Sequence, residues 1–401
     1  MKYYMIAGEA SGDLHGSNLI KELHKLDANA NIRCWGGDLM QAAGATLVKH
    51  YKELAFMGFI EVLMNLRTIL KNLAFCKKDI QQFKPDVLVL IDYPGFNLRI
   101  TEWAKQQGFK VAFYISPQVW AWKESRVKKM KQTIDHMMVI LPFEKNYYKN
   151  KWDWDVEYVG HPLVQVIEEF KEKVDSSEMN VNSIKDAAVI NQLLTVNALT
   201  THHSPLSVAQ PLTKPIIALL PGSRKQEILK KLPVMLEVSK AFTQYQFVVA
   251  KAPGQDDAFY EALLQPYPNV AAVAGKTYYL LAQASAALVT SGTATLETAL
   301  FGVPEVVCYK GSNISYQIAK RLIKVKYISL VNLIMDKLVV KELIQNELTV
   351  ENATRELHSL LEDEERKAQL QKDYADLKAI LSAGGNASAK AAHSVYTIAA
   401  A

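Results

Sequence analysis

The stretch Val289–Pro304, VTSGTATLETALFGVP, decides the fold. The apolar run Ala286–Val289 before it is typical of a buried strand, and the strand stops at a turn of small residues, TSG. Apolar residues then recur at helical spacing, so a helix is expected to begin at once. Gly302 and Pro304 end that helix before a second apolar run, Val306–Tyr309. This strand–helix–strand order predicts an α/β fold with a parallel sheet.

The turn in this stretch predicts an anion site. A helix that begins directly after a strand aims free backbone N–H groups and the positive end of its dipole at one point, where phosphate binds. Glu297 lies four residues after Thr293, on the same helix face, where a carboxylate can accept hydrogen bonds from both hydroxyls of a ribose. The alternative is an ordinary strand–helix–strand unit with a Glu on its solvent face. A second strand-end turn, Leu220–Arg224, adds Gly222, Ser223 and a guanidinium, and the two turns together favour a nucleotide-diphosphate site.

Length and composition set further bounds. The chain has 401 residues, enough for two domains, and its formal net charge of +5 does not by itself indicate nucleic acid. Three scattered cysteines without a C-x-x-C pair exclude a disulfide framework and a cysteine zinc site, and they suit the reducing cytosol. We expect no signal peptide and no membrane span, because no apolar run approaches the roughly 20 residues that a spanning helix needs.

Apolar runs and helical segments alternate in two series, which predicts two Rossmann-like domains with mostly parallel sheets facing a cleft. The expected strands are Tyr3–Ala7, Ile32–Trp35, Val87–Ile91, Lys110–Ile115, Met137–Leu141 and Val156–Val159, then Ile216–Leu220, Phe247–Ala250, Val270–Val273, Ala286–Val289 and Val306–Tyr309. The expected organisation is a first domain over 1–170, a polar linker or insertion over 171–214, a second domain over 215–380, and a C-terminal helix over 381–401 that packs across the domain junction.

Two strand ends in the first half carry carboxylates. The turn Gly8–Asp13, GEASGD, lacks the G-x-G-x-x-G pattern, so a nicotinamide or flavin enzyme is not indicated. Ser11 or Asp13 is expected to cap the following helix, and Gly12 allows close approach, but a plain cap does not explain Glu9 inside the turn. Asp92 follows the most apolar strand, where open α/β sheets bind ligands, so it is placed as a catalytic carboxylate is; a capping Asp is the alternative.

Two segments combine apolar and cationic residues. The segment 54–83 is helical in period and apolar around much of its circumference, which fits a core helix or a patch on a lipid surface; its residues include Phe56, Phe59 and Leu63. Trp120 and Trp122 precede Lys123 and Arg126, a cluster that fits a phosphorylated lipid or an anionic membrane better than nucleic acid. A solvated basic face is the alternative.

Neither short motif with metal-ligand residues indicates a metal site. Asp153-Trp154-Asp155 spells the D-x-D pattern of some metal-dependent glycosyltransferases, but it precedes a strand and has no glycine-rich partner, so we interpret it as chance. The pair His202-His203 has no further ligand at metal spacing and is interpreted as surface loop. We expect no bound metal and no cofactor.

Seven motifs in a fixed order resemble one family. They are GEASGD at 8–13, IDYPGFN at 91–97, SPQVWAW at 116–122, LPFE at 141–144, GHP at 160–162, LPGSR at 220–224 and SGTATLE at 291–297. Together they resemble the lipid-A-disaccharide synthases, bacterial glycosyltransferases of the GT-B architecture, over nearly the whole chain. Two departures are a longer linker at 171–214 and Gly95, which stands where many relatives carry a second acid.

The resemblance implies a reaction and residues for it. UDP-2,3-diacylglucosamine and 2,3-diacylglucosamine 1-phosphate would give the β-1,6-linked disaccharide 1-phosphate and UDP at the inner-membrane surface. The positions that match the family's nucleotide site are Arg224, Ser291, Gly292, Thr293, Glu297 and Asn332. Asp92 matches the proposed base, with Glu9 next in line. A UDP-sugar 2-epimerase and a non-catalytic nucleotide-sugar sensor are the alternatives, and the sequence leaves open whether the chain forms a homodimer.

Overall fold

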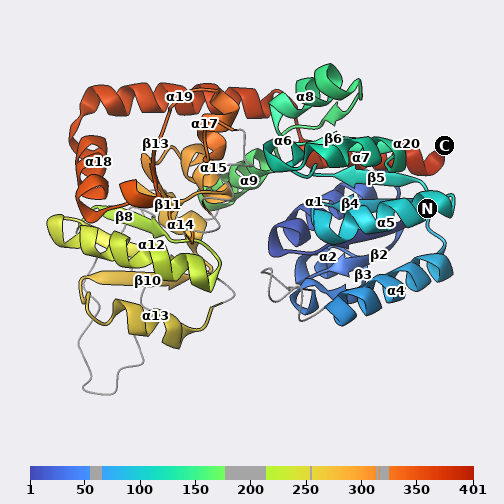
Figure 1. The fold of residues 1–401 in the computed structure, drawn as a ribbon, viewed down its shortest axis with the longest axis horizontal. Coiled ribbons are helices and arrows are strands. Elements are labelled where there is room, and N and C mark those ends of the chain that lie inside the picture. The colour runs from blue at the N-terminus through green and yellow to red at the C-terminus, as the bar shows by residue number, and fades with distance from the viewer. Residues whose placement is uncertain (55–65, 177–213, 253–254, 313–315, 317–324) are drawn as a thin grey trace. The chain divides into compact units, whose positions relative to one another are not determined.

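The computed structural model describes residues 1–54, 66–176, 214–252, 255–312, 316 and 325–401. The chain divides into two compact units, one formed by Met1–Pro162 with Ile380–Ala401 and the other by Leu163–Ala379. Each unit contains a sheet of parallel strands with helices packed on it (Figure 1). The predicted α/β class, with two parallel sheets, is confirmed.

The first unit is built on a seven-stranded sheet in the order β3-β2-β1-β4-β5-β6-β7. Its strands are β1 (Lys2–Ala7), β2 (Asn31–Gly36), β3 (Thr46–His50), β4 (Val87–Ile91), β5 (Val111–Tyr114), β6 (His136–Val139) and β7 (Glu157–Tyr158). Its helices are α1 (Ala10–Leu26), α2 (Asp38–Ala42), η1 (Tyr51–Glu53), α4 (Leu66–Phe83), α5 (Pro94–Gln106), α6 (Val119–Trp122), η2 (Glu124–Arg126), α7 (Val127–Thr133), α8 (Pro142–Trp152) and α20 (Ala387–Ala400).

Helices cover both faces of this sheet, which explains why its central strands are continuous apolar runs. Alternate strand residues such as Tyr4 and Leu88 pack against α4, α5, α7 and α8. Their neighbours in sequence, such as Met5 and Val89, pack against α1 and α20. The alanine-rich helix α20 therefore completes the core of the first unit, although it comes from the other end of the chain.

The second unit has a six-stranded parallel sheet in the order β10-β9-β8-β11-β12-β13. Its strands are β8 (Ile216–Leu220), β9 (Gln246–Lys251), β10 (Val270–Ala274), β11 (Ala284–Thr290), β12 (Glu305–Tyr309) and β13 (Lys341–Ile344). Its helices are α12 (Lys225–Val238), η3 (Ser239–Ala241), α13 (Asp257–Leu264), α14 (Thr277–Leu281), α15 (Thr293–Leu300), α17 (Leu330–Met335), η4 (Gln345–Glu347), α18 (Val350–Glu362) and α19 (Glu364–Ser382). Helix α9 (Pro162–Ser176) begins where the chain passes from the first unit to the second.

Each sheet has one point where the strand order reverses. In the first sheet the chain moves outward in opposite directions from β1 and from β4, and in the second from β8 and from β11. The loops beyond these neighbouring strands therefore diverge and leave room at the carboxyl edge, the usual ligand position in open α/β sheets. GEASGD and IDYPGFN follow β1 and β4, and LPGSR and SGTATLE end or follow β8 and β11.

Most expected elements are present, but two edge strands and one helix cap differ from expectation. Strands β3 and β13 were not predicted, because an edge strand such as Thr46–His50 is half-exposed and lacks a continuous apolar run. Neither Ser11 nor Asp13 caps α1, whose N-cap is Glu9. The Asp13 carboxylate instead accepts hydrogen bonds from the backbone N–H groups of α2, at 2.7 Å from Gly37 and 3.0 Å from Met40. It caps the second helix, not its own.

Of the predicted linker over 171–214, residues 171–176 form the end of α9, and residues 177–213 lie outside the described residues, as do Phe56, Phe59 and Leu63. Within the described ranges, none of the helices has the length and apolar content that a membrane span requires.

Candidate functional site

The switch point of the second sheet holds a pocket of about 390 Å³. The turn after β8, the end of β9, the start of α14, the turn after β11 and the first turns of α15 form its wall. The predicted nucleotide residues that line it are Gly222, Ser223, Arg224, Ser291, Gly292, Thr293 and Glu297. The structure thus brings together two motifs that lie about seventy residues apart in the sequence.

Backbone geometry prepares this pocket for an anion. Gly222 and Gly292 have φ angles of +109° and +137°, a region that residues with a Cβ rarely adopt, and so the turns need glycine. Gly292 is the N-cap of α15, and the backbone N–H groups that follow it begin the helix. The first N–H groups of a helix lack partners within it and carry partial positive charge. A phosphate at this turn would accept hydrogen bonds from these N–H groups and would be attracted by their partial positive charge.

Three cationic side chains lie at or beside the pocket. Arg224 lines it and is 60% exposed, and its guanidinium is 3.5 Å from the Glu227 carboxylate. Lys251 also lines it and pairs with Asp257 at 2.5 Å. Lys231, which the sequence did not single out, lies on α12 with only 3% of its side chain exposed. Its ammonium donates to the Thr290 hydroxyl and is 3.6 Å from Glu227.

Lys231 strengthens the phosphate interpretation of the pocket. Thr290 and Glu227 are lining residues, so the Lys231 ammonium is held directly behind the wall. Burial lowers the pKa of Lys231 from its ordinary value, while the Glu227 carboxylate acts in the opposite direction. A diphosphate in the pocket would add a second anionic partner for this ammonium. The sequence signal was present, since Lys231 lies seven residues after Arg224, two helical turns along the same face.

Glu297 lines the pocket from α15, as predicted from its spacing to Thr293. The Tyr278 hydroxyl donates to the Glu297 carboxylate at 3.1 Å and holds it in place. Burial raises the pKa of Glu297 above its ordinary value, and the hydrogen bond from Tyr278 opposes that shift. One carboxylate oxygen is thus oriented by the protein, and the carboxylate lies where a ligand in the pocket can reach it.

Asn332 is not among the residues that line the pocket. Its fully buried amide donates to Val340 O at 2.8 Å and to the Glu342 carboxylate at 2.9 Å, and it accepts from the backbone N–H groups of Val339 and Val340. Glu342 in turn accepts from Ile328 N at 3.1 Å, and Ile328 O accepts from the Ser291 hydroxyl at 2.9 Å. Asn332 therefore reaches the pocket only through this chain of hydrogen bonds.

We expect Asn332→Ala to destabilise the second unit and to weaken nucleotide binding only indirectly. The change leaves buried backbone groups without partners, at a cost of about 1–3 kcal/mol for each unsatisfied group. The melting temperature should fall, whereas UDP affinity measured well below melting should change less than fivefold. A variant with wild-type melting temperature and a large loss of UDP affinity would instead make Asn332 a direct ligand.

The switch point of the first sheet brings Asp92 and Glu9 close together. Strands β1 and β4 pair with Ala7 opposite Ile91, so the turns that carry the two carboxylates start at the same level. The Tyr93 ring covers Gly8, where an added Cβ would lie 2.3 Å from ring atoms, and only glycine fits. Asp92 is not the N-cap of α5, which is Tyr93, but its carboxylate accepts a hydrogen bond from the Tyr93 backbone.

The environment of Asp92 suits a base. Burial, and secondly the nearby Glu9 carboxylate, raise the pKa of Asp92 to about 6. The backbone is held in a left-handed turn with φ of +44°, fixed by a hydrogen bond from Asp92 N to Tyr114 O at 3.0 Å and by the Asn97 amide, which donates to Asp92 O at 2.8 Å. A base whose pKa lies nearer the working pH accepts a proton more readily than an ordinary carboxylate.

The predicted acceptor and membrane residues differ in exposure. Ser11 is exposed, and Gly12 is buried with α1 packed close to β1. Trp120 is half-buried, because its indole N–H donates to the Glu144 carboxylate at 3.0 Å and its ring packs edge-on against Phe143. Trp122 is 52% exposed, with the Lys123 ammonium 4.0 Å from the centre of its ring. Lys123 and Arg126 are half-buried.

Glu144 explains the LPFE motif. It is 1% exposed, and burial raises its pKa to about 8. Besides the bond from Trp120, its carboxylate accepts from Leu141 N at 3.1 Å, which closes the first turn of α8. Glu144 therefore positions Trp120 and the start of α8.

Asp153 and Asp155 are surface residues. Both carboxylates pair with Lys149, at 3.4 and 2.9 Å. Among the described residues, no three His, Cys, Asp or Glu side chains are arranged to hold a metal ion.

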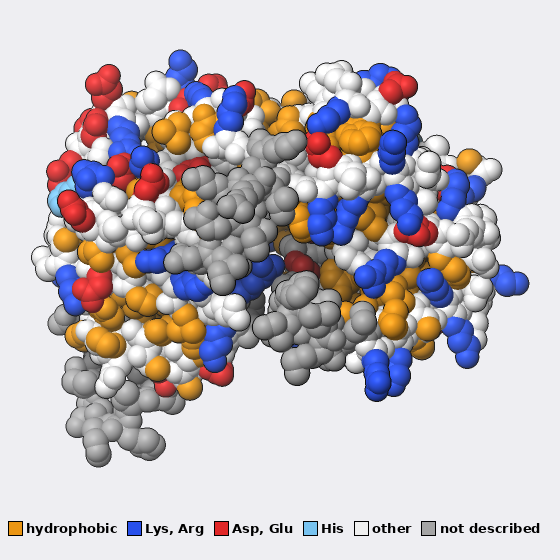
Figure 2. Space-filling view, viewed as in Figure 1, with side chains coloured by type: hydrophobic (Ala, Val, Ile, Leu, Met, Phe, Trp, Pro, Cys, Tyr) orange, Lys and Arg blue, Asp and Glu red, His pale blue; other side chains and the backbone are white. Residues whose placement is uncertain are grey.

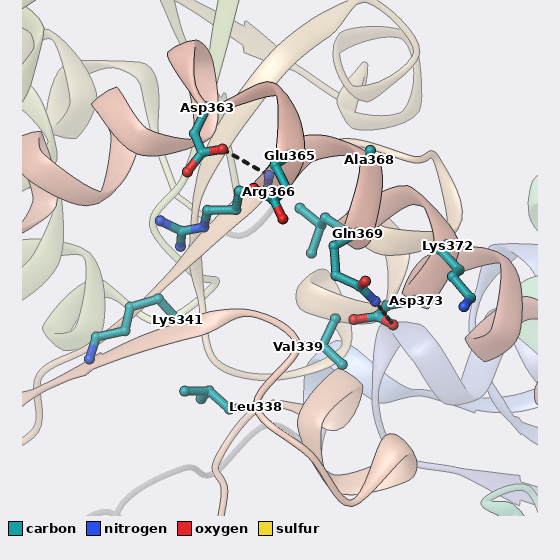
Figure 3. A pocket seen from close by; sticks show the side chains of 11 residues that line it. Leu338, Val339, Lys341, Asp363, Glu365, Arg366, Ala368, Gln369, Lys372 and Asp373 are labelled. Atoms are coloured by element: carbon teal, nitrogen blue, oxygen red, sulfur yellow. Dashed lines mark hydrogen bonds between the residues drawn. The ribbon is translucent and has the colours of Figure 1, made fainter.

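A larger groove of about 790 Å³ lies in the second unit between the start of α19 and residues 338–341 (Figure 3). None of the predicted site residues lines it. Two of its carboxylates have partners: Asp363 accepts from the backbone Arg366 N at 2.9 Å, and Asp373 accepts from Gln369 at 3.0 Å and pairs with Lys337 at 2.6 Å.

Comparisons with known proteins agree with this geometry. A family model described as lipid-A-disaccharide synthetase matches residues 3–195 and 200–397. The lipid-A-disaccharide synthase of Syntrophus aciditrophicus is 37% identical over 381 residues, covering 93% of this chain and 92% of that protein. Lipid-A-disaccharide synthase 1 of Legionella pneumophila strain Paris is 34% identical over 387 residues, covering 94% and 92%.

Solved structures share the fold at low sequence identity. A UDP-GlcNAc 2-epimerase from Neisseria meningitidis bound to UDP-GlcNAc superposes with a TM-score of 0.65 at 14% identity, covering 99% of each chain. The glycosyltransferase of kitacinnamycin superposes with a TM-score of 0.61 at 13% identity, covering 99% of this chain and 98% of that one. At this identity the likeness shows the GT-B fold alone, whereas the sequence match spans both units and all seven motifs. This chain belongs to the lipid-A-disaccharide synthetase family.

Proposed function

We propose that this chain transfers 2,3-diacylglucosamine from UDP to the 6-hydroxyl of 2,3-diacylglucosamine 1-phosphate, giving the β-1,6-linked lipid A disaccharide 1-phosphate and UDP. Beyond family membership, the proposal rests on the groups that lie at the two switch points. One holds a pocket with cations and a helix N-terminus, and the other holds a carboxylate of raised pKa. A glycosyl transfer from a nucleotide diphosphate needs both.

The proposal assigns each step of a single displacement. The acceptor oxygen O6 attacks C1 of the donor sugar, the bond from C1 to the UDP oxygen breaks, and Asp92 takes the O6 proton. Attack on the face opposite the leaving group inverts the configuration at C1. The charge that develops on UDP is stabilised by Arg224, by Lys231 behind Thr290, and by the start of α15. Glu297 accepts hydrogen bonds from the ribose hydroxyls.

Release of UDP with and without acceptor tests the proposal against its alternatives. Purified protein given both lipid substrates should release UDP and form disaccharide, and donor alone should release little. A chelator should not slow turnover, because the proposal assigns stabilisation of the negative charge on UDP to protein groups. An epimerase would isomerise the sugar of the donor when no acceptor is present. A sensor would bind UDP and turn over neither substrate.

We propose further that the first unit attaches peripherally to an anionic membrane. In the described part of the segment 54–83, Leu70 and Phe75 are 54% and 48% exposed, although α4 is otherwise packed on the sheet. Trp122 and Lys123 add an exposed aromatic ring with a cation stacked on it. Figure 2 shows Lys and Arg side chains among hydrophobic ones on the visible face of this unit. Exposed aromatic and basic residues together favour a lipid surface.

Vesicle flotation gives the measurement for this attachment. Binding to vesicles that contain an anionic phospholipid should weaken at high salt, because salt screens exposed charges. The double change Leu70→Ser and Phe75→Ser should reduce the binding that remains at high salt, since apolar burial is not screened. A protein that does not float with anionic vesicles even at low salt would contradict the proposal.

A further inference from the structure

A second pocket of about 370 Å³ lies in the first unit between α5 and η2–α7. Pro94 and Gly95 from the start of α5 form part of its wall, and Arg99, Arg126 and Lys129 bring three cations to it. The volume lies in the range of small-molecule sites. We propose that this pocket binds a phosphomonoester, and that its occupant is the 1-phosphate of the acceptor sugar; this assignment of the substrate group rests on the proposed function.

The charges in the pocket are not balanced. Glu102 is the carboxylate on its wall, and it pairs with Lys129 across the two helices. Within the described part of the chain, no carboxylate lies within salt-bridge distance of either Arg99 or Arg126. The Arg126 charge also contributes, after burial, to the lowered pKa of Lys123. Two guanidinium groups that have no acidic partner among the described residues, beside one open pocket, favour an anionic ligand. A guanidinium suits a phosphate because it donates two parallel hydrogen bonds.

The location fits the reaction. Pro94 lies two residues after Asp92, so their Cα atoms are at most about 7.6 Å apart. In glucosamine 1-phosphate the phosphate is attached to C1, and the 6-hydroxyl is on C6, which is attached to C5; C1 and C5 are the two carbons bonded to the ring oxygen. A phosphate held beside Arg99 and Arg126 therefore leaves the 6-hydroxyl within one sugar of the pocket, in the neighbourhood of the Asp92 turn. No atom of the described residues lies within 4 Å of a Cβ built on Gly95, so this part of the chain leaves that side of the pocket open.

Binding of a soluble probe tests the site without membranes and without turnover. Glucosamine 1-phosphate should bind the wild-type protein in a phosphorus NMR titration, and a proton NMR titration should show no comparable binding of glucosamine. Arg99→Gln and Arg126→Gln should each weaken the phosphorylated probe about tenfold or more. Lys128→Gln is the matched control, because Lys128 is an exposed cation on α7 that does not line the pocket. It should bind the probe like wild type.

Kinetics with the lipid acceptor distinguish the site from the proposed function. Both arginine variants should raise the KM for the phosphorylated acceptor about tenfold with unchanged KM for the UDP-sugar, and they should show no added loss with an acceptor that lacks the phosphate. Failure of the wild type to form disaccharide, with arginine-dependent probe binding intact, would overturn the function but not the phosphate site. Wild-type probe binding and acceptor KM in both variants would overturn the site. If the two arginine variants lose binding to phosphatidate vesicles but keep wild-type binding of glucosamine 1-phosphate, the arginines bind lipid headgroups, and the assignment to the acceptor is overturned.

Discussion

Replacing Asp92 by Asn is expected to lower kcat by about 10²–10⁴-fold, the usual contribution of general base catalysis. Asparagine keeps the size and most hydrogen bonds of the side chain, but it cannot accept the proton of the acceptor hydroxyl. UDP affinity should not change, because the nucleotide pocket belongs to the other unit. Asp86→Asn is the matched control: this exposed carboxylate lies before β4, at the opposite end of the strand, and its loss should leave kcat unchanged.

The same residue predicts the pH dependence. A base must be deprotonated to act, and burial and the Glu9 charge raise the pKa of Asp92 to about 6. The rate constant kcat/KM should therefore be level above that pH and fall about tenfold per unit below it. Glu9→Gln removes a negative charge, which should lower the pKa of Asp92 and move the inflection to lower pH. If Glu9→Gln abolishes turnover while Asp92→Asn does not, Glu9 is the base.

The stability of Asp92→Asn follows from the sign of the pKa shift. A carboxyl whose pKa is higher in the folded than in the unfolded protein favours folding when protonated, and this contribution is lost as the pH rises through the folded value. At pH 8 the wild type holds an unfavourable buried charge, so Asp92→Asn should melt at the same temperature or slightly higher. A marked loss of stability would mean that the rate effect reflects misfolding.

The second large effect concerns the donor. Arg224→Ala and Glu297→Ala should each weaken UDP binding about 10- to 150-fold, since each change removes a charged hydrogen-bonding partner worth roughly 1.5–3 kcal/mol. Uridine separates their roles. Arg224→Ala should bind uridine as the wild type does, because the arginine is assigned to the diphosphate. Glu297→Ala should lose affinity for both ligands, because both contain the ribose.

Calorimetry with UDP and uridine checks this assignment. Lys225→Ala is the matched control for Arg224, because Lys225 is the adjacent exposed cation, lies over the Phe259 ring, and does not line the pocket. Wild-type UDP affinity in both Arg224→Ala and Glu297→Ala would contradict the assignment of the nucleotide to this pocket. Equal losses of UDP affinity in Lys225→Ala and Arg224→Ala would mean that the effect comes from the net charge of the protein and not from a direct contact of Arg224.

Local patterns in the sequence predicted the central strands, the turns that end them and the pocket at the second switch point. The stretch Val289–Pro304 forms the expected strand end, turn and helix, and Glu297 lies on the predicted face. These features depend on neighbours within one or two turns of the chain. The edge strand β3 escaped prediction because it is half-exposed and mixed in composition, and β13 because its four residues begin with the charged pair Lys341 and Glu342.

Contacts between distant segments were beyond sequence reasoning. Asp13 has the spacing of a cap for its own helix, but its partners lie at Gly37 and Met40, on another element. Asn332 matches a nucleotide position by resemblance, yet its amide is enclosed by Val340 and Glu342. Lys231 lies among apolar helix positions, and only the fold shows that its ammonium meets Thr290 at the pocket.

The anomeric configuration of the product tests the central claim most directly. Wild-type protein, given a donor whose sugar is α-linked to UDP together with the phosphorylated acceptor and a chelator, should form disaccharide in an amount equal to the UDP released. Proton and carbon NMR of that product should show a β anomeric proton and a bond from C1 to O6, as a single displacement with Asp92 as base requires. An α-linked product, or UDP released without disaccharide, would contradict this account.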